Sequence, residues 1–263
     1  MKFENLSLEK KESIATIILN RPGSLNALNI PLAGELLDAM EDCGHDDNTR
    51  VVVLKGAGRA FCGGGDIKGM KDSLMEDPSL FLKRLTRLAH GVILAIRELK
   101  KPVIAEVQGM ASGAGFSLTL ASDFVVTSKD AQFNMAYTNI GLSPDLGSSF
   151  ILPRLIGLQR ANELFFTGRM IDAEEGLRLG FINRVVPGDK LDEATMELAT
   201  QLAQRPPLAL ETTKALVNQS LFRGLEAQLE AERTKISESG ATEDFKEGLN
   251  AFFEKRRPSF RGK

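Results

Sequence analysis

The chain has 263 residues, 43% of them hydrophobic, which is enough for the core of one large domain or two small ones. Its 33 basic and 35 acidic residues give a net charge of −2, which excludes the strongly basic balance typical of nucleic-acid-binding proteins. The chain contains no run of about 18 apolar residues, and its first residues lack the apolar core of a signal peptide. Cys43 and Cys62 have the spacing of neither a metal site nor a disulfide framework. We therefore expect a cytoplasmic protein that binds no metal, no nucleic acid and no membrane.

Strand and helix patterns alternate through the first half of the chain. Apolar and β-branched runs of strand length occupy residues 13–20, 50–56, 101–111 and 123–128. Apolar residues at helical spacing mark 30–43 and 80–99, small residues mark a buried helix at 112–122, and helical patterns follow from residue 157. This order predicts an α/β core followed by a C-terminal helical extension, with a boundary near Gly188.

Two glycine-rich loops each follow a predicted strand: FCGGGDIK at residues 61–68 and QGMASGAGFSL at residues 108–118. Glycine lets the backbone approach a ligand closely, and a loop that enters a helix presents unpaired N–H groups. Two such loops can direct two N–H groups at one oxygen, as an oxyanion hole in which one donor contributes roughly 3–4 kcal/mol to transition-state stabilisation. The alternative is that these are ordinary turn glycines, since neither loop has a phosphate-binding spacing.

Five motifs follow one another along the chain: LNRPGSLNALN, GAGRAFCGGGDIK, KPVIAEVQGMASGAGFSLTLASDFVV, GLSPDLGSSFILPRLIG and EGLNAFFEKRRPSF. Together they resemble the crotonase (enoyl-CoA hydratase/isomerase) superfamily from Ser13 to Phe260. The resemblance implies an α/β crotonase fold, with repeated ββα units forming a spiral core at residues 1–188. It implies a C-terminal helical region at residues 189–263 that forms trimers and completes the CoA site. It also implies an acyl-CoA thioester substrate, no cofactor beyond the coenzyme A of that substrate, and a homotrimer or dimer of trimers.

The same resemblance assigns roles to single residues. The backbone N–H groups of Gly65 and Ala114 match the oxyanion donors that hold the thioester oxygen. Other positions match residues that bind the substrate, the last two often from a neighbouring subunit: Ala27, Asp66, Ile67, Lys68, Gly113, Tyr137, Asn139, Phe252 and Lys255. Asp66 has a second interpretation, as the cap of a short helix after the first glycine-rich loop.

The chain departs from the hydratase pattern at two positions. Enoyl-CoA hydratases hold and activate a water between two glutamates, and the matching residues here are Ser117 and Tyr137. Hydration needs an acid and a base beside the water, and Ser and Tyr side chains ordinarily have pKa values far from neutral. We therefore do not expect hydratase activity.

Asp145, in the run GLSPDLGSSF, matches the carboxylate of the Δ3,Δ2-enoyl-CoA isomerases and the ring-1,2-epoxyphenylacetyl-CoA isomerases. An allylic isomerisation needs one base, which removes a proton from C2 and returns it at C4. We expect Leu142, Leu146 and Phe150 to form an apolar pocket, where desolvation strengthens a carboxylate as a base. The alternative for Asp145 is a turn or helix cap. We expect His90, in the middle of a predicted helix, to serve packing or the surface rather than catalysis.

The leading hypothesis is an acyl-CoA isomerase that shifts a double bond, or rearranges an unsaturated or epoxide acyl-CoA, with Asp145 as its single base. Two alternatives remain open: an enoyl-CoA hydratase of fatty-acid or aromatic-acid degradation, and a non-catalytic member that only binds CoA esters. Turnover of crotonyl-CoA distinguishes the hydratase, and binding without turnover distinguishes the non-catalytic member.

Overall fold

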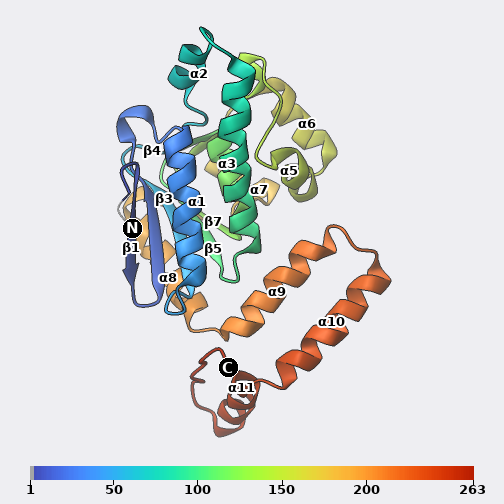
Figure 1. Cartoon of the computed structure of the whole chain (residues 1–263). Helices are drawn as coiled ribbons and strands as arrows, with labels where there is room; N and C mark the ends of the chain where they lie inside the picture. The colour runs from blue at the N-terminus through green and yellow to red at the C-terminus, as the bar shows by residue number, and fades with distance from the viewer. Residues whose placement is uncertain (1–2) are drawn as a thin grey trace.

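Two β-sheets form the centre of the computed structural model, which describes residues 3–263 (Figure 1). In the six-stranded sheet the strand order is β1 (Leu6–Lys11), β2 (Ile14–Leu19), β3 (Val51–Gly56), β5 (Val103–Val107), β7 (Phe124–Ser128) and β10 (Arg184–Val186). In the four-stranded sheet it is β4 (Ala60–Cys62), β6 (Met110–Ser112), β8 (Gln132–Asn134) and β9 (Ile171–Asp172).

Helices cover the sheets and form the last part of the chain. In order they are α1 (Ile30–His45), α2 (Ile67–Ser73), α3 (Pro78–Glu98), α4 (Ala114–Ala121), α5 (Ser148–Ile156), α6 (Leu158–Thr167), α7 (Ala173–Leu179), α8 (Leu191–Ala203), α9 (Pro207–Ser220), α10 (Leu225–Gly240) and α11 (Glu243–Glu254). Within residues 3–263, no helix combines the length and the apolar character needed to cross a membrane.

Successive strands are divided between the two sheets in a repeating manner. β3, β5 and β7 pair in parallel in the six-stranded sheet, and the strands that follow them, β4, β6 and β8, pair in parallel in the other sheet. Helices separate these units: α2 and α3 follow β4, α4 follows β6, and α5 and α6 follow β8. The predicted α/β fold of repeated ββα units is therefore confirmed. The single strand predicted at residues 101–111 is two strands, one in each sheet, because the chain bends at Gln108 and Gly109.

Both faces of β3 are buried, which explains its uninterrupted apolar run. Val52 and Leu54 pack into the larger core cluster, which α1 and α3 join from positions side by side in Figure 1. Val51 and Val53 pack instead against Leu198 of α8 and its neighbours. Since successive side chains of a strand point to opposite faces, α8 covers the face opposite α1 and α3.

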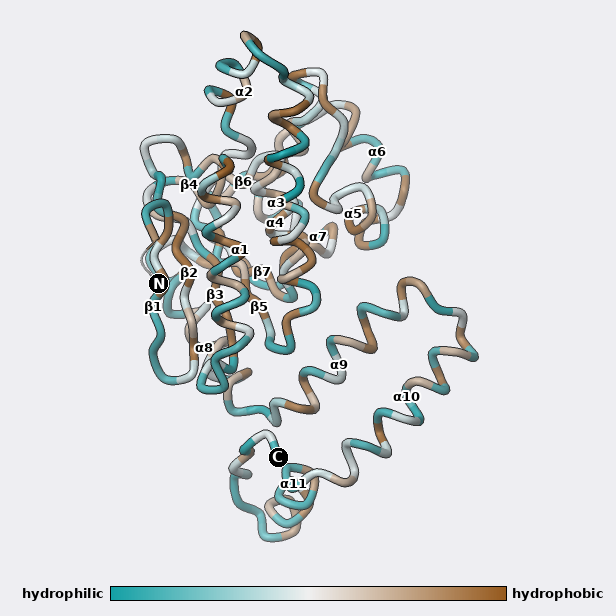
Figure 2. Tube along the Cα trace, viewed as in Figure 1, coloured by the Kyte–Doolittle hydropathy of each residue, from teal (hydrophilic) through white to brown (hydrophobic). Residues whose placement is uncertain are grey.

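The helices that leave the core begin with α9 rather than α8. Because α8 packs on the central sheet, the boundary predicted after residue 188 precedes a helix of the core. α9, α10 and α11 extend away from the core (Figure 1), and apolar stretches recur along them (Figure 2). The large apolar side chains exposed in and between these helices are Val217, Leu221, Phe222, Leu225, Leu229, Ile236, Phe245, Leu249, Phe252 and Phe253. Such a surface is typical of an interaction site and suits the predicted trimerisation, which remains a prediction.

Helix α4 lies in the interior, with all eight of its residues buried. Its second residue, Gly115, has the backbone of β4 directly beside it, because a Cβ built there would lie 2.1 Å from the carbonyl oxygen of Cys62. Real Cβ atoms do not approach so closely, and a backbone oxygen in a strand cannot swing aside. Glycine at position 115 therefore sets how closely the two glycine-rich loops can approach each other.

We predict that Gly115→Ala lowers the free energy of unfolding by about 2 kcal/mol or more, because overpacking a tight backbone contact costs roughly 1–3 kcal/mol. Gly34→Ala is the matched control, since a Cβ there would lie 4.0 Å from the Leu88 side chain. The control should be neutral or stabilising by up to about 1 kcal/mol, the helix-propensity gain of Ala over Gly. Urea unfolding followed by circular dichroism measures both variants. Equal stability of the two would show that the contact at Gly115 relaxes freely.

Candidate active site

A cavity of about 480 Å³ opens beside the two glycine-rich loops. Its walls come from residues 63–65 and 112–114 of the two loops, from α2 and α3, and from the segment 136–146. Most of the remaining side chains on its walls are apolar: Leu28, Ile67, Met70, Leu82, Leu85, Ala89, Ile140, Leu142 and Leu146. The structure therefore brings together segments that are far apart in the sequence around one mainly apolar space.

The first glycine-rich loop is held in place by backbone pairing with residue 28. The Leu28 N–H donates to the Gly64 carbonyl at 2.7 Å, and the Asp66 N–H donates to the Leu28 carbonyl at 3.0 Å. Gly64 has φ of +109°, a conformation that favours glycine. A Cβ at Gly64 would lie 3.1 Å from the Ser112 carbonyl oxygen and 4.0 Å from the backbone nitrogen of Ala114. The two loops are therefore in direct contact.

Two backbone N–H groups remain available at this contact. In residues 3–263, neither the Gly65 N–H nor the Ala114 N–H donates a hydrogen bond to another protein group. Ala114 is the first residue of α4, where the N–H has no partner within the helix and the helix dipole favours negative charge. Both residues line the cavity. The two residues expected to supply the oxyanion donors thus line one cavity, and their role as donors remains a prediction.

Asp145 lies on the opposite loop and is fixed through its backbone. Its carbonyl oxygen accepts hydrogen bonds from the Ser148 hydroxyl at 2.8 Å and from the Ser117 hydroxyl at 3.2 Å. The following helix, α5, has Gly147 as its N-cap and no side-chain cap. The interpretation of Asp145 as a helix cap is therefore wrong, but the alternative of a turn residue is confirmed, because the Ser148 N–H donates to the Asp145 carbonyl at 3.1 Å. Asp145 also lines the cavity.

His90 was expected to serve packing or the surface, and its exposed side chain agrees with a surface position, but it also makes a contact that was not expected. Its Nε2 atom lies 2.6 Å from Oδ1 of Asp145. The His90 side chain is 54% exposed and the Asp145 side chain 28%. The two residues are 55 positions apart in the sequence, so no local pattern could have paired them. His90 directly follows Ala89, whose side chain lines the cavity from α3, and this neighbour was the only available signal.

The apolar surroundings predicted for Asp145 are present only in part. Leu142 and Leu146 line the cavity, as expected. Phe150 instead lines a second cavity, beside α9, where its ring stacks on Phe222 with centroids 5.2 Å apart. The reason is that α5 begins at Ser148 and turns Phe150 away from the loop.

The two positions that match the glutamates of the hydratase pattern, Ser117 and Tyr137, lie together. The hydroxyls of Ser117 and Tyr137 are 2.9 Å apart, and the Tyr137 hydroxyl also donates to the Asp145 carbonyl at 3.4 Å. Ser117 is fully buried. Burial is the largest influence on Tyr137 and raises the pKa of its phenol well above its ordinary value. This pair is therefore neutral and offers no charged acid or base to a water.

Only some of the other residues predicted to bind the substrate line the cavity. Ile67, Gly113, Tyr137 and Asn139 line the cavity. Those that do not reach its walls in the described chain are Ala27, Asp66, Lys68, Phe252 and Lys255. Asp66 accepts hydrogen bonds from the N–H groups of Lys68 and Gly69, so its interpretation as the cap of α2 is confirmed.

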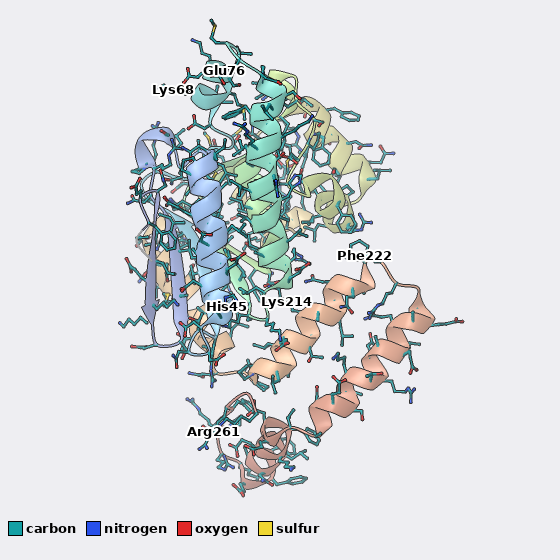
Figure 3. All side chains as sticks on the ribbon, viewed as in Figure 1. His45, Lys68, Glu76, Lys214, Phe222 and Arg261 are labelled. Atoms are coloured by element: carbon teal, nitrogen blue, oxygen red, sulfur yellow. The ribbon has the colours of Figure 1, made fainter. Side chains whose placement is uncertain are left out.

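The last two positions, Phe252 and Lys255, belong to the end of the molecule far from the cavity. They lie in and directly after α11, whereas α2 stands at the opposite end in Figure 1. Figure 3 shows the same separation between Lys68 on α2 and Arg261 beyond α11. Within one chain they cannot complete the site, so their predicted contribution depends on a neighbouring copy.

Exposed basic side chains are frequent on the two helices that line the cavity. They are Lys68, Lys71, Lys83, Arg84 and Arg87. Their charge is complementary to phosphate groups at the entrance of an apolar cavity. In residues 3–263, no group of three or more His, Cys, Asp or Glu side chains is arranged to hold a metal ion.

Comparisons with known proteins find similar proteins over nearly the whole chain. The family profile described as enoyl-CoA hydratase/isomerase matches residues 9–263. The chain is 34% identical over 263 residues to a trans-2-decenoyl-[acyl-carrier-protein] isomerase of Streptococcus mutans, with 100% of both chains covered. It is 35% identical over 264 residues to a 1,2-epoxyphenylacetyl-CoA isomerase of Escherichia coli, again with 100% of both covered. An enoyl-CoA hydratase structure from Bacillus anthracis matches with a TM-score of 0.94 and 33% identity, over 99% of this chain and 100% of that one.

The repeated ββα units and these matches define the class as crotonase-fold enzymes. The chain belongs to the enoyl-CoA hydratase/isomerase family, within the crotonase superfamily. The similar proteins are named both as isomerases and as hydratases, so the choice between these reactions has to come from the site itself.

We predict that Asp66→Asn lowers the free energy of unfolding by about 1 kcal/mol at neutral pH, because the charged ion pair with Arg21, 2.9 Å long, is lost while the cap remains. Burial alone would raise the pKa of Asp66, but the Gly69 N–H, the Arg21 guanidinium and the Lys68 N–H together hold it below the ordinary 3.8. A pKa lowered by folding stabilises the protein above the ordinary value, and this contribution is lost as the pH falls through the folded-state value. Urea unfolding at a series of pH values should therefore show the wild-type advantage shrinking below about pH 4.

The matched control for this measurement is Asp72→Asn, an exposed aspartate in the same helix. It should leave both the stability and its pH dependence unchanged. A wild-type advantage over Asp66→Asn that persists undiminished in acid would mean that the charge of Asp66 does not stabilise the loop.

Proposed function

We propose that the protein is an acyl-CoA isomerase that shifts a double bond through an enolate, with Asp145 as its single base. One observation carries the proposal: among the described residues that line the cavity, Asp145 is the only carboxylate. An allylic proton shift needs one group that can take and return a proton. Addition of water needs two such groups, and Ser117 and Tyr137 do not supply them.

The chemistry follows from the placement of the groups. Asp145 removes a proton from C2 of a 3-enoyl thioester, and the C–H electron pair moves into the enolate. The N–H groups of Gly65 and Ala114 hold the thioester oxygen as its negative charge develops. Asp145 then returns a proton at C4, which leaves the conjugated 2-enoyl thioester. The apolar walls of the cavity accommodate the acyl chain, and rearrangement of an epoxide acyl-CoA would use the same enolate stabilisation.

The carrier of the acyl group belongs to the same proposal. The basic side chains on α2 and α3 support a phosphate-bearing carrier, with coenzyme A as the first choice and no other cofactor. One similar protein is named for an acyl-carrier-protein substrate, so the same acyl chain should be assayed on both carriers. Assembly as a homotrimer or a dimer of trimers completes the proposal, because Phe252 and Lys255 can contact a CoA moiety only from a neighbouring copy.

The hydratase alternative draws support from relatives such as the protein named crotonyl-CoA hydratase of Syntrophomonas wolfei. The neutral pair of Ser117 and Tyr137 counts against it. A non-catalytic CoA-ester-binding protein is the remaining alternative, and the free N–H groups beside a single carboxylate count against that.

We predict that wild-type protein converts a 3-enoyl-CoA to its 2-enoyl isomer and that Asp145→Asn lowers kcat by at least about 10³-fold, within the range for loss of a general base. Hydration of crotonyl-CoA should be negligible in both. Absorbance of the conjugated thioester follows the first reaction, and its loss follows the second. Calorimetric titration with a saturated acyl-CoA should show that Asp145→Asn still binds.

Two results would contradict this assignment. Rapid hydration of crotonyl-CoA that survives Asp145→Asn would support the hydratase alternative and place the base elsewhere. Tight acyl-CoA binding without turnover of any enoyl isomer would support the non-catalytic alternative.

We predict that Ala114→Pro lowers kcat by about 10²–10³-fold, the effect of removing one oxyanion donor. Proline is tolerated at the first position of a helix, where its missing N–H had no helical partner. Ala114→Gly is the control, since it keeps the N–H. Steady-state kinetics measures the effect, and thermal unfolding checks that both variants fold. Unchanged kcat in a folded Ala114→Pro protein would remove this N–H from the oxyanion hole.

A further inference from the structure

The carboxylate of Asp145 stands between the cavity and His90. Its Oδ1 atom contacts the Nε2 atom of His90 at 2.6 Å, and its Oδ2 atom has no hydrogen bond within the described chain. Asp145 lines the cavity, whereas His90 is not among the described residues that do. One carboxylate oxygen is therefore available to a substrate while the other is held by the imidazole.

The two sides of this carboxylate differ in their access to water. On the inner side, the Ser117 hydroxyl is fully buried and its hydrogen bonds go to protein groups. On the outer side, the His90 side chain is 54% exposed. The buried residues of α3 are Leu85, Ala89, Val92, Ile93 and Ile96, and His90 directly follows one of them, Ala89. His90 therefore lies at the edge of the buried face of α3, in contact with both solvent and the base.

We infer that His90 is a positioning residue that holds Asp145 in place and relays its protons to and from solvent. This inference rests on the proposed isomerase function. Imidazole is suited to the role because it exchanges protons readily near neutral pH and has two nitrogens, one for each neighbour. A bound acyl chain would cover the cavity side of Asp145, so the outer side is the route that stays open.

The proton taken from C2 moves to Asp145, and its electron pair remains in the enolate. Asp145 passes the proton to Nε2 of His90 in the tautomer that carries its own proton on Nδ1, so the ring becomes an imidazolium while Asp145 becomes a carboxylate again. The exposed imidazolium exchanges its ring protons with water and gives one proton back to Asp145. Asp145 delivers that proton to C4, so the product carries a hydrogen from solvent and both side chains return to their initial states.

The test is isomerisation of a 3-enoyl-CoA in D₂O by wild type and His90→Gln, with mass spectrometry of the product. Glutamine can still donate a hydrogen bond to Asp145 but cannot take up a proton near neutral pH. Wild type should place solvent deuterium at C4. His90→Gln should lower kcat by about tenfold, a part of the general acid–base range, and should lower the deuterated fraction several-fold, because Asp145 then returns the proton that it removed.

The only other histidine provides the control. His45 lies in the last turn of α1, far from α2 (Figure 3), and His45→Gln should match wild type in rate and deuterium content. A lower kcat in His90→Gln with an unchanged deuterated fraction would reduce His90 to a structural role and overturn the relay. Wild-type product without solvent deuterium would overturn it as well.

A second measurement separates this inference from the proposed function. Because the chain has two histidines, imidazole ¹⁵N spectra resolve each ring, and His45→Gln assigns them. Asp145→Asn should change the His90 signals and leave those of His45 unchanged. Failure of wild type to isomerise any 3-enoyl-CoA would overturn the proposed function, and the spectra would still decide the contact. Unchanged His90 signals in Asp145→Asn would overturn the relay even in an active isomerase.

Discussion

The site depends on a close contact between two backbones that side chains would prevent. Gly115 lies against the Cys62 carbonyl, and Gly64 lies against the Ser112 carbonyl, each at a distance that leaves no room for a Cβ to sit comfortably. This contact brings the free N–H groups of two separate strand exits to one cavity. The buried position of α4 adds to the effect, since a helix dipole acts more strongly where water is excluded. The glycines therefore act by allowing this close approach, and the backbone N–H groups supply the hydrogen-bond donors.

The loop with Asp145 is held in place through its backbone, while the Asp145 side chain makes a separate contact with His90. Hydroxyl groups from Ser117 and Ser148 bind the Asp145 carbonyl, and the next two residues, Leu146 and Gly147, have φ of +52° and +71°. A leucine in this region is strained, and such strain persists only where the surrounding contacts enforce it. The turn ends the loop before α5 begins, so the carboxylate is not needed as a cap.

Local sequence patterns predicted the helices and strands of the fold better than the arrangement of the side chains in the site. The alternation of strands and helices predicted an α/β core, and glycine content predicted the two loops, because both features are encoded over a few neighbouring residues. The repeated ββα units came from the resemblance to the crotonase superfamily. The pairing of His90 with Asp145 was not predictable, since it arises when α3 packs beside a loop 55 residues away. Phe150 was assigned to the wrong cavity for a related reason: one turn at Leu146 and Gly147 reverses the direction of the chain. The packing of α8 on the core was missed because an amphipathic pattern shows a buried face but does not identify what covers it.

The site combines one carboxylate with two neutral hydroxyls, and this combination suits a proton shift between two carbons. Family members share a scaffold, and their chemistry is set by a few side chains on it. Here the two inner positions hold the neutral hydroxyls of Ser117 and Tyr137, which bond to each other and to the Asp145 carbonyl. Both hydroxyls are uncharged and already bond to protein groups. A water in this space would therefore find no base to activate it. The single carboxylate stands at the border of this space, where it can reach an acyl chain on one side and His90 on the other. A group placed in this way is suited to carrying a proton between two carbons, because each step of that reaction uses the same oxygen atoms and needs no second nucleophile.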